Sequence, residues 1–489
     1  MRINRRQFNK LVATGTLSAV SWSGSAVSWA GAIGATTKRT DIRPVEASLK
    51  TELYPFRTPL KFGGRVVNDL TGLNVEVEVE NREGRRAKGT GAMPVGNVWA
   101  WPGGVTDPEM TSKAMILFAE KVIQRGRVFK EFGHPLEVTH DFSACYEDIA
   151  RETVQELGIK EPMPKLAQKN ATSPFDAALF DAFGKLYDVN VHHLLSKEFC
   201  NRDLSYYFDA TRFGDDCRGE YLDQYTRRTP QARMPLYHLV GALDPLTPAD
   251  ITSPINDGLP EDLIQWILYN GLTHLKIKLN GDDLAWDVAR VLNIDRVTAE
   301  TQKKRNCTEW FYSVDFNERC ANVEYVLEFF AKIREGSPQA FERLQYAEQP
   351  THRDLKAFPE NKMHLAAKIK PIVIDESLVD NESLLDCRRM GYSGIALKAC
   401  KGHGASLLMG AAAQKYKMFL CVQDLTCPGA SFLQSATLAA RIPTVAAIEG
   451  NARQFCPKAN DPWVEKYPSM FVINDGTVGT NVLTGNGLY

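Results

Sequence analysis

The chain has 489 residues, of which 44% are hydrophobic and 24% are charged, so it can bury a large core and global disorder is excluded. Its 58 basic and 59 acidic residues leave a formal net charge of -1, which excludes a nucleic-acid binder that acts through bulk positive charge. No apolar stretch reaches the roughly 18–20 residues that a membrane-spanning helix needs, so no membrane span is expected.

The first 30 residues carry a charge pattern of their own. They contain four basic residues and no acid; Arg5 and Arg6 precede an apolar run over 11–20. This pattern indicates an export signal, and the paired arginines resemble the twin-arginine type, whose cargo is exported after folding. We expect the twin-arginine export machinery as a partner and a periplasmic or secreted mature protein. Removing 1–30 leaves 54 basic and 59 acidic residues, a charge of -5. The alternative is a disordered basic N-terminus.

Ten cysteines are spread along the rest of the chain. None forms a C-x-x-C pair, and the spacing that zinc sites use is absent. Their share of the chain, about 2%, is far below that of domains built on disulfides. We therefore expect buried thiols and no obligatory disulfide framework.

Residues 45–190 have the mixed pattern of an α+β domain. Positions 73–80 alternate between apolar and polar residues, as in a half-buried strand, and Gly84 follows at a turn. Two tryptophans, Trp99 and Trp101, come next among prolines and glycines. The pattern predicts a second domain ahead of the regular repeat that follows.

A regular rhythm begins near residue 235. Short runs rich in β-branched and apolar residues recur, and most intervals between them look helical. The predicted strands are 235–241, 274–279, 311–317, 344–350, 371–377, 394–400, 418–424 and 444–450. Alternating strands and helices predict a parallel sheet, and eight such strands are the number of a closed (β/α)8 barrel. An open doubly wound sheet is the alternative, although no G-x-G-x-x-G follows any of these strands, so a dinucleotide site has no support.

In six of the eight runs we single out ionisable residues near the carboxyl end, where a barrel gathers its catalytic groups. These residues are Lys276, Lys278, Asp315, Glu348, Asp375, Lys398 and Glu449. Three carboxylates on consecutive strands would repel one another without a cation, and three oxygen ligands with room for water and substrate suit Mg²⁺. Lysines two positions apart face the same way along a strand, and their repulsion lowers a lysine pKa toward the range of a general base. Taken singly, each acid has the alternative of a helix cap or a surface group.

These residues stand in motifs that resemble the enolase superfamily, in its mandelate racemase/muconate lactonizing enzyme branch and most closely the muconate lactonizing subgroup. The motifs are Lys276-x-Lys278, Asp315-Phe316-Asn317, Tyr346-Ala347-Glu348-Gln349-Pro350, Asp375-Glu376-Ser377 and Ala396-Leu397-Lys398. Upstream, 173–185 resembles the helix of that branch with an A-x-x-D-x-x-G-K pattern. Near the end, 474–478 and 485–487 resemble its closing segment, so the resemblance spans roughly residues 45–489.

The resemblance implies an α/β fold with a (β/α)8-type barrel, a modified TIM barrel, over 235–450. It also implies an α+β capping domain built from 45–190, to which the C-terminal segment 451–489 returns. Because the capping loops of the family close over the barrel mouth, Trp99 and Trp101 are candidate pocket-wall residues. Ordinary packing in the core of the capping domain is the alternative for both.

The resemblance also implies roles for the ionisable residues. The implied ligands of Mg²⁺, with Mn²⁺ as a substitute, are Asp315, Glu348 and Asp375. Lys278 and Lys398 are the implied acid/base pair on opposite faces of the substrate, and Lys276 adds positive charge and lowers the pKa of Lys278. Asn317 is expected to support the metal ligands. Glu449 matches a position that hydrogen-bonds the substrate carboxylate.

These roles imply an enzyme that removes the proton α to the carboxylate of a small molecule through an enediolate. A lysine on each face favours a racemase or epimerase; the alternatives are a sugar-acid dehydratase, a lactonizing cycloisomerase, or a barrel that only binds acidic ligands. The His–Asp dyad of mandelate racemase-like members is missing, because strand seven ends in Gln423-Asp424. His403 either reaches the site or is a solvated loop histidine. The family is commonly oligomeric, so a homo-oligomer is expected.

The chain is longer than a typical member of that family. The extra length lies in polar stretches, such as 131–170 and the charged connector 212–233. The interval 281–309 between the second and third predicted strands is also long. We expect an insertion there to lie beside the catalytic face and to affect the choice of substrate.

Overall fold

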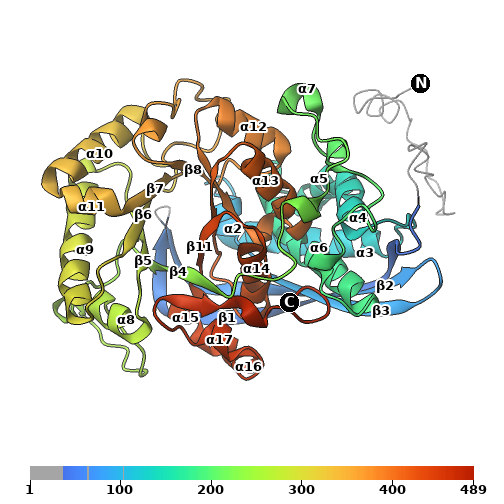
Figure 1. The fold of residues 1–489 in the computed structure, drawn as a ribbon, viewed down its shortest axis with the longest axis horizontal. Helices are drawn as coiled ribbons and strands as arrows, with labels where there is room; N and C mark the ends of the chain where they lie inside the picture. Colours follow the sequence, from blue (N-terminus) through green and yellow to red (C-terminus); the bar gives the residue numbers. More distant parts are fainter. Residues whose placement is uncertain (1–36, 63–64, 103) are drawn as a thin grey trace. The chain divides into compact units, whose positions relative to one another are not determined.

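Eight parallel strands close into a barrel in the second half of the chain (Figure 1). This computed structural model describes residues 37–62, 65–102 and 104–489, so the expected export signal at 1–30 lies outside the described residues. The strands are β4 (Arg233–Val240), β5 (His274–Lys278), β6 (Phe311–Asp315), β7 (Leu344–Glu348), β8 (Ile372–Ile374), β9 (Gly394–Leu397), β10 (Phe419–Val422) and β11 (Val445–Glu449). Each pairs in parallel with the next, and β11 pairs with β4, which closes the ring. The predicted barrel is confirmed, and the alternative of an open sheet is wrong.

Helices connect most of the barrel strands. They are α8 (Leu263–Asn270), α9 (Leu284–Lys304), α10 (Val323–Gly336), α11 (Pro338–Arg343), α12 (Asn381–Arg389), α13 (His403–Lys415) and α14 (Ala430–Arg441). The interval 281–309, expected as an insertion beside the catalytic face, is instead the crossover helix α9 of 21 residues. Asp283 caps its first turn by accepting from the amide of Trp286, and two lysines in its last turn face the negative end of the helix dipole. Between β7 and β8, the described residues form only a 3-10 turn, η6 (Ala366–Lys368).

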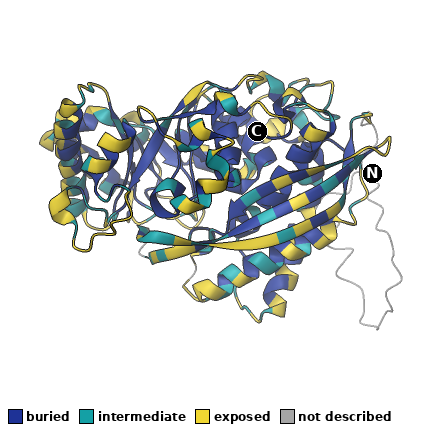
Figure 2. Cartoon of the chain, turned by 90° about the horizontal axis from the view of Figure 1, so that it is seen from below, coloured by how far each residue is buried: buried dark blue, intermediate teal, exposed yellow. Residues whose placement is uncertain are grey.

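An antiparallel sheet and a group of helices form the cap. The sheet has the order β1 (Ile42–Phe62), β2 (Arg65–Asn81), β3 (Arg86–Pro94). The helices are α2 (Asn97–Ala100), α3 (Pro108–Gly126), α4 (Pro135–Phe142), α5 (Tyr146–Glu156), α6 (Lys165–Leu186) and the short α7 (Ala210–Phe213). One face of β2 alternates into the core, as the pattern at 73–80 predicts, while many of the residues in the sheet are exposed (Figure 2). The β1–β2 hairpin continues well beyond β3, and its far end lies at the barrel mouth.

Helix α6 lies directly on β3 because two glycines remove the side chains between them. A Cβ atom at Gly89 would stand 2.2 Å from the carbonyl oxygen of Ala178, and one at Gly91 would stand 2.1 Å from that of Pro174. Any other residue at either position would push the helix away from the sheet. The close contact fixes the part of the cap that faces the barrel.

The C-terminal residues contact both the barrel and helix α6. Strand β12 (Thr477–Gly479) pairs antiparallel with β4, after the short helices α15 (Ala452–Phe455), α16 (Asp461–Val464) and α17 (Pro468–Phe471). Asp181 of α6 accepts from the amide of Leu488 (2.9 Å) and from that of Thr90 in β3 (2.8 Å). One carboxylate therefore joins the last residues of the chain to the capping sheet.

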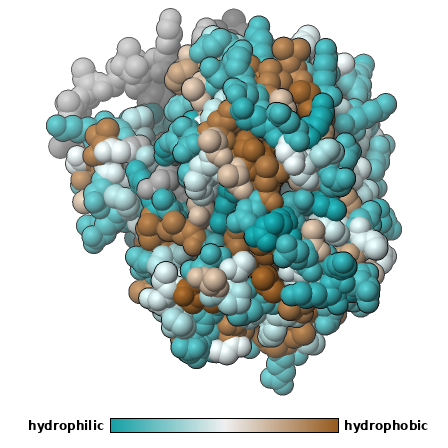
Figure 3. Space-filling model, turned by 90° about the vertical axis from the view of Figure 1, so that its left-hand side faces the viewer, coloured by the Kyte–Doolittle hydropathy of each residue, from teal (hydrophilic) through white to brown (hydrophobic). Residues whose placement is uncertain are grey.

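Several expectations about the surface and the thiols can be checked here. All ten cysteines are free, and all are buried except Cys145 and Cys307, which are half-buried. No helix in the described part of the chain is both long and apolar enough to span a membrane. Apolar side chains are scattered over the surface, with Leu268 and Tyr269 of α8 among the exposed ones, and Figure 3 shows such patches among hydrophilic areas.

Candidate active site

The carboxyl ends of the barrel strands bring the ionisable residues of the sequence together. Lys278 is paired in register with Asp315 of β6, and Asp315 with Glu348 of β7. Asp375 and Lys398 come just after β8 and β9, and Glu449 ends β11. All seven side chains predicted from the strand ends are buried. We refer to Lys276, Lys278, Asp315, Glu348, Asp375, Lys398 and Glu449 as the charged floor.

Lys276 is the centre of the charged floor. Its Nζ lies 3.2 Å from Asp315 Oδ2, 3.0 Å from Glu348 Oε1 and 3.2 Å from Glu449 Oε2. Burial alone would lower the pKa of Lys276, but the surrounding carboxylates, Glu348 foremost, raise it well above its usual value. Lys276 is therefore held as an ammonium ion by the carboxylates that surround it.

Asp315 is the link between the two lysines of β5. Its Oδ2 lies 2.5 Å from Lys278 Nζ, and its Oδ1 accepts from the amide of Asn317 at 2.9 Å. Burial would raise the pKa of Asp315, but Lys278 and Lys276 outweigh it and hold the pKa below the usual range. Asp315 is therefore ionised and fixed in orientation. Asn317 supports it through backbone that adopts a φ of 45°.

Glu348 is the least compensated carboxylate of the floor. Burial and the nearby Asp315 raise its pKa above the usual value, although Lys276 acts in the opposite direction. The Gln423 amide donates to its second oxygen and also to the hydroxyl of Tyr346 (3.3 Å). An additional positive charge near Glu348 would thus be favourable.

Asp375 organises the opposite side of the site. It accepts from Lys398 (2.8 Å) and from the indole Nε1 of Trp99 (3.3 Å) on one oxygen, and from Lys401 (3.1 Å) on the other. Burial alone would lower the pKa of Lys398, but the ion pair with Asp375 raises it above its usual value. Lys398 also lies over the Trp99 ring, 4.4 Å from its centroid. A side chain of the cap thus holds both members of this ion pair.

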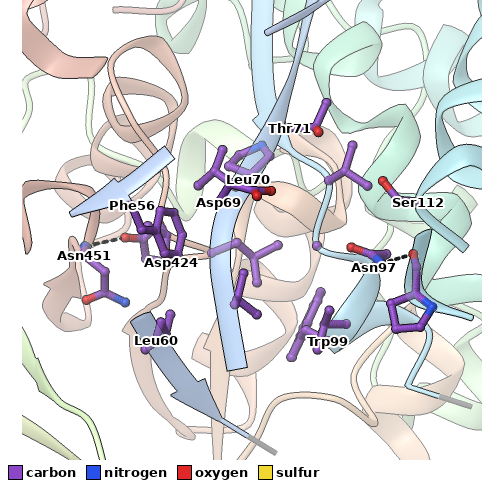
Figure 4. Close-up of a pocket in the computed structure, with 18 of the residues that line it drawn as sticks. Phe56, Leu60, Asp69, Leu70, Thr71, Asn97, Trp99, Ser112, Asp424 and Asn451 are labelled. Atoms are coloured by element: carbon purple, nitrogen blue, oxygen red, sulfur yellow. Dashed lines mark hydrogen bonds between the residues drawn. The ribbon is translucent and has the colours of Figure 1, made fainter. Parts of the chain in front are cut away.

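A cavity of about 1090 Å³ lies above the charged floor (Figure 4). Lys278 and Lys398 both line it, and they come from β5 and β9, which are four positions apart in the ring of eight strands. They therefore face the cavity from opposite sides of the barrel. Asp315 and Glu348 are not among the described residues that line the cavity. Lys276 and Lys278, which contact these two carboxylates, do line it.

The donor set fits a hard divalent ion such as Mg²⁺ in chemical type and in number. Three carboxylates stand at the ends of neighbouring strands, and burial together with the nearby Asp315 raises the pKa of Glu348, an effect that a bound cation would oppose. In the described residues, however, the oxygens of Asp315, Glu348 and Asp375 are bonded to lysine, amide or indole groups. No group of three or more His, Cys, Asp or Glu side chains there is arranged to hold a metal ion.

The other candidate residues separate into lining and core. Asn317, Glu449 and Trp99 line the cavity. Trp101 is buried in the hydrophobic core and is not among the described lining residues. His403 is fully buried against Phe180 and is neither a lining residue nor a solvated loop histidine.

Several residues of the site were missed in the sequence. They are Lys401, Gln423, Asp424, Asn451 and Glu376. Lys401 is fully buried and also donates to the Asp375 carbonyl at 2.7 Å. Its position three residues after Lys398 was a usable signal, since a second lysine beside a buried strand end needs a partner. The Asn451 amide donates to Glu449 at 2.6 Å, a contact that no local pattern indicates.

Comparisons with known proteins support the fold. No protein-family model matches the chain, and no curated protein matches it. Among solved structures, a mandelate racemase/muconate lactonizing protein from Herpetosiphon aurantiacus aligns with a TM-score of 0.59 and 19% identity, covering 92% of this chain and 99% of that chain. A muconate lactonizing enzyme from Pseudomonas fluorescens complexed with muconolactone aligns with a TM-score of 0.55 and 16% identity, covering 91% and 95%. A dipeptide epimerase from Enterococcus faecalis, complexed with Mg and the dipeptide L-Leu-L-Tyr, aligns with a TM-score of 0.56 and 15% identity. The alignment covers 84% of this chain and 90% of that chain. At these identities the shared property is the fold.

Proposed function

We propose that this protein is a member of the mandelate racemase/muconate lactonizing enzyme family of the enolase superfamily and removes the proton next to a substrate carboxylate. The observation that carries the proposal is the pair Lys278 and Lys398. These two buried lysines face one cavity from opposite sides of the barrel, and each is ion-paired to a carboxylate of the floor. A reacting carbon between them is within reach of an acid/base group on each face.

Two opposed lysines suit a racemase or epimerase. One lysine, as the free amine, takes the α-proton and becomes an ammonium ion, and the other, as the ammonium ion, returns a proton to the opposite face. One proton leaves the α-carbon and one is added to its opposite face, so the product is the stereoisomer of the substrate. Lys276, held as an ammonium ion by three carboxylates, supplies positive charge to the substrate carboxylate.

The site also has the residues for a divalent ion. Asp315, Glu348 and Asp375 would hold Mg²⁺, or Mn²⁺ in its place, and the ion would stabilise the negative charge that develops on the substrate carboxylate. A solved structure of similar fold, the Enterococcus dipeptide epimerase, is described as a complex with Mg. Asn317 supports Asp315, while Asn451 and Lys276 fix Glu449 at the same end of the cavity.

The experiment uses solvent deuterium. Single enantiomers of a panel of 2-substituted carboxylic acids are incubated with the full chain and MgCl2 in D2O, and the loss of the α-proton is followed by NMR. The native protein is expected to exchange and interconvert both enantiomers of its substrate. Lys278→Met and Lys398→Met should each slow the exchange of one enantiomer by about 10²–10⁴-fold and leave the other less affected. Lys303→Met, an exposed lysine of α9, is the control and should behave like the native protein.

The outcomes separate the alternatives. If no acid of the panel loses its α-proton, the catalytic proposal is wrong and a barrel that only binds acidic ligands is favoured. If one lysine variant abolishes all exchange while the other has no effect, a single base acts, as in elimination or cycloisomerisation. If each lysine variant loses the exchange of a different enantiomer, the racemase or epimerase is supported.

Export and assembly remain proposals as well. We propose that 1–30 direct the chain to the periplasm or outside through the twin-arginine machinery and that the mature chain forms a homo-oligomer. Replacing Arg5 and Arg6 by lysine should leave the full-length precursor in the cytosol. Export of this variant at the native level would contradict the proposal.

A further inference from the structure

The lining of the cavity above the charged floor changes from charged to apolar side chains directly beside Lys276. Leu239 of β4 is paired in register with Lys276 and is 1% exposed. Leu60 of β1 packs on Leu239, and half-buried Phe56 belongs to the same cluster. Figure 4 shows Phe56, Leu60 and Leu70 of the hairpin strands in the pocket with Trp99 of the cap and Asp424 and Asn451 of the barrel. We refer to the apolar lining residues Phe56, Leu60, Leu70, Val95, Leu239 and Leu425 as the apolar wall.

The apolar wall is held in place by contacts between the hairpin and the barrel. The Phe56 ring lies 5.6 Å from that of Phe455, just after β11. Arg57 donates two hydrogen bonds to Asp257, at 2.6 and 2.7 Å, in the loop that follows β4. Since β1 is held at Phe56 and at Arg57, the wall is a built part of the cavity.

The wall disfavours a substrate rich in hydroxyl groups. Leu60, Leu70 and Val95 are each at most 7% exposed, and they offer no hydrogen bonds to hydroxyls that would lose their water on binding. A buried apolar group of the substrate gains from the same surface. The part of the substrate that faces the wall is therefore apolar.

The outer rim disfavours a second carboxylate. Exposed Asp69, Glu109 and Glu120 line it, and among the described lining residues Lys113 is the one cation outside the charged floor. A second negative charge on the substrate would meet more acids than bases there. The cavity volume of about 1090 Å³ leaves room for a large neutral group.

From these layers we infer that the substrate is a monocarboxylate that carries a bulky apolar group on its α-carbon. This inference rests on the proposed function, because it places the substrate carboxylate on the charged floor. The wall disfavours polyhydroxylated acids, and the rim disfavours dicarboxylates.

The test measures binding with probes that cannot react. Calorimetry of the full chain in buffer with MgCl2 compares 2-methyl-2-phenylpropanoate, which has no α-hydrogen, with gluconate and with 2,2-dimethylglutarate. The phenyl acid is expected to bind at least about tenfold more tightly than the other two. Equal or tighter binding of gluconate or of dimethylglutarate, or no binding of the phenyl acid, overturns the inference.

Variants of the wall give a second measurement. Leu60→Asn and the half-buried loop variant Leu425→Asn should weaken binding of the phenyl acid about fivefold or more and leave binding of the small 2,2-dimethylpropanoate within about twofold. Leu53→Asn, on the same strand but 63% exposed, is the matched control and should change neither affinity. Leu425→Asn keeps the test readable if Leu60→Asn fails to fold. Native-like binding of the phenyl acid by the wall variants overturns the inference.

The two proposals fail separately. The calorimetry measures binding alone and does not depend on proton removal. Tighter binding of the phenyl acid would therefore support the substrate inference even if no acid exchanged its α-proton for deuterium. Such a result would overturn the catalytic proposal alone. Exchange confined to sugar acids or dicarboxylates would overturn the substrate inference and leave the catalytic proposal intact.

Discussion

His403 offers a direct test of how burial controls charge in this fold. It begins α13, is fully buried, and lies 4.9 Å from the ring of Phe180 and 5.5 Å from that of His192. Neither ring nitrogen has a hydrogen-bond partner among the described residues. Burial lowers the pKa of His403 to about 3, so the folded protein keeps it neutral. The proposed change is His403→Leu, which is similar in volume and cannot be protonated.

The magnitude follows from proton binding in the two states. In the unfolded chain the imidazole has a pKa of about 6.5, so at pH 5.5 it binds about 0.9 proton that the folded state does not bind. The stability that neutral His403 contributes is present above pH 6.5 and is lost as pH falls toward 3. Between pH 7.5 and 5.5 this loss is about 1.4 kcal/mol. The nearby carboxyl of Asp176 is present in both proteins, so its own titration cancels in the comparison.

The assay is urea unfolding of the native chain and the variant, followed by tryptophan fluorescence at both pH values. The free energy of unfolding of His403→Leu relative to the native chain should rise by about 1.4 kcal/mol on going from pH 7.5 to 5.5. His352→Gln, an exposed histidine, is the control and should show no such change. A difference between His403→Leu and the native chain that is independent of pH would refute the reasoning.

Three further predictions concern polar contacts, two of them buried and one at the surface. Lys401→Met should cost about 3 kcal/mol of unfolding free energy, because it leaves Asp375 short of a buried partner; unchanged urea unfolding would contradict this. Arg57→Gln and Asp257→Asn should show a coupling of roughly 1 kcal/mol in a double-mutant cycle of unfolding, and additive effects would mean that the pair does not anchor the hairpin. Asp181→Asn should cost about 1–3 kcal/mol and speed digestion of the C-terminal residues by carboxypeptidase; native-like digestion would show that another contact holds them.

Much of the barrel was predictable because its signals are local. Each strand is a short apolar run, and all eight are present where the pattern places them. The predicted ends of the strands were less accurate than their positions. Strand β8 ends at Ile374 and β9 at Leu397, so Asp375 and Lys398 follow the strands and do not lie within them. Composition does not show where backbone pairing ends, because the next side chains are as buried as the strand itself.

What was missed depends on contacts between distant segments. The pKa of Lys276 is raised because carboxylates from three other strands surround it, and no pattern local to Lys276 shows those contacts. Trp99 and Trp101 differ by two positions, yet only Trp99 reaches the cavity. The interval 281–309 was expected to hold an insertion beside the catalytic face because its length was evident from the sequence, whereas the helix that fills it was not recognised.

The β1–β2 hairpin has a consequence for how this scaffold can change. Its outer half carries its own ladder, with Leu60 opposite Val67 and Lys61 opposite Val66, and it contributes to the cavity without supplying any residue of the charged floor. A graft of a different hairpin end would therefore alter the chemistry that the cavity accepts while the strand ends of the barrel stay untouched. The hairpin's share of the apolar wall and the charged floor thus lie on separate segments of the chain, which lets selection or design revise one without having to rebuild the other.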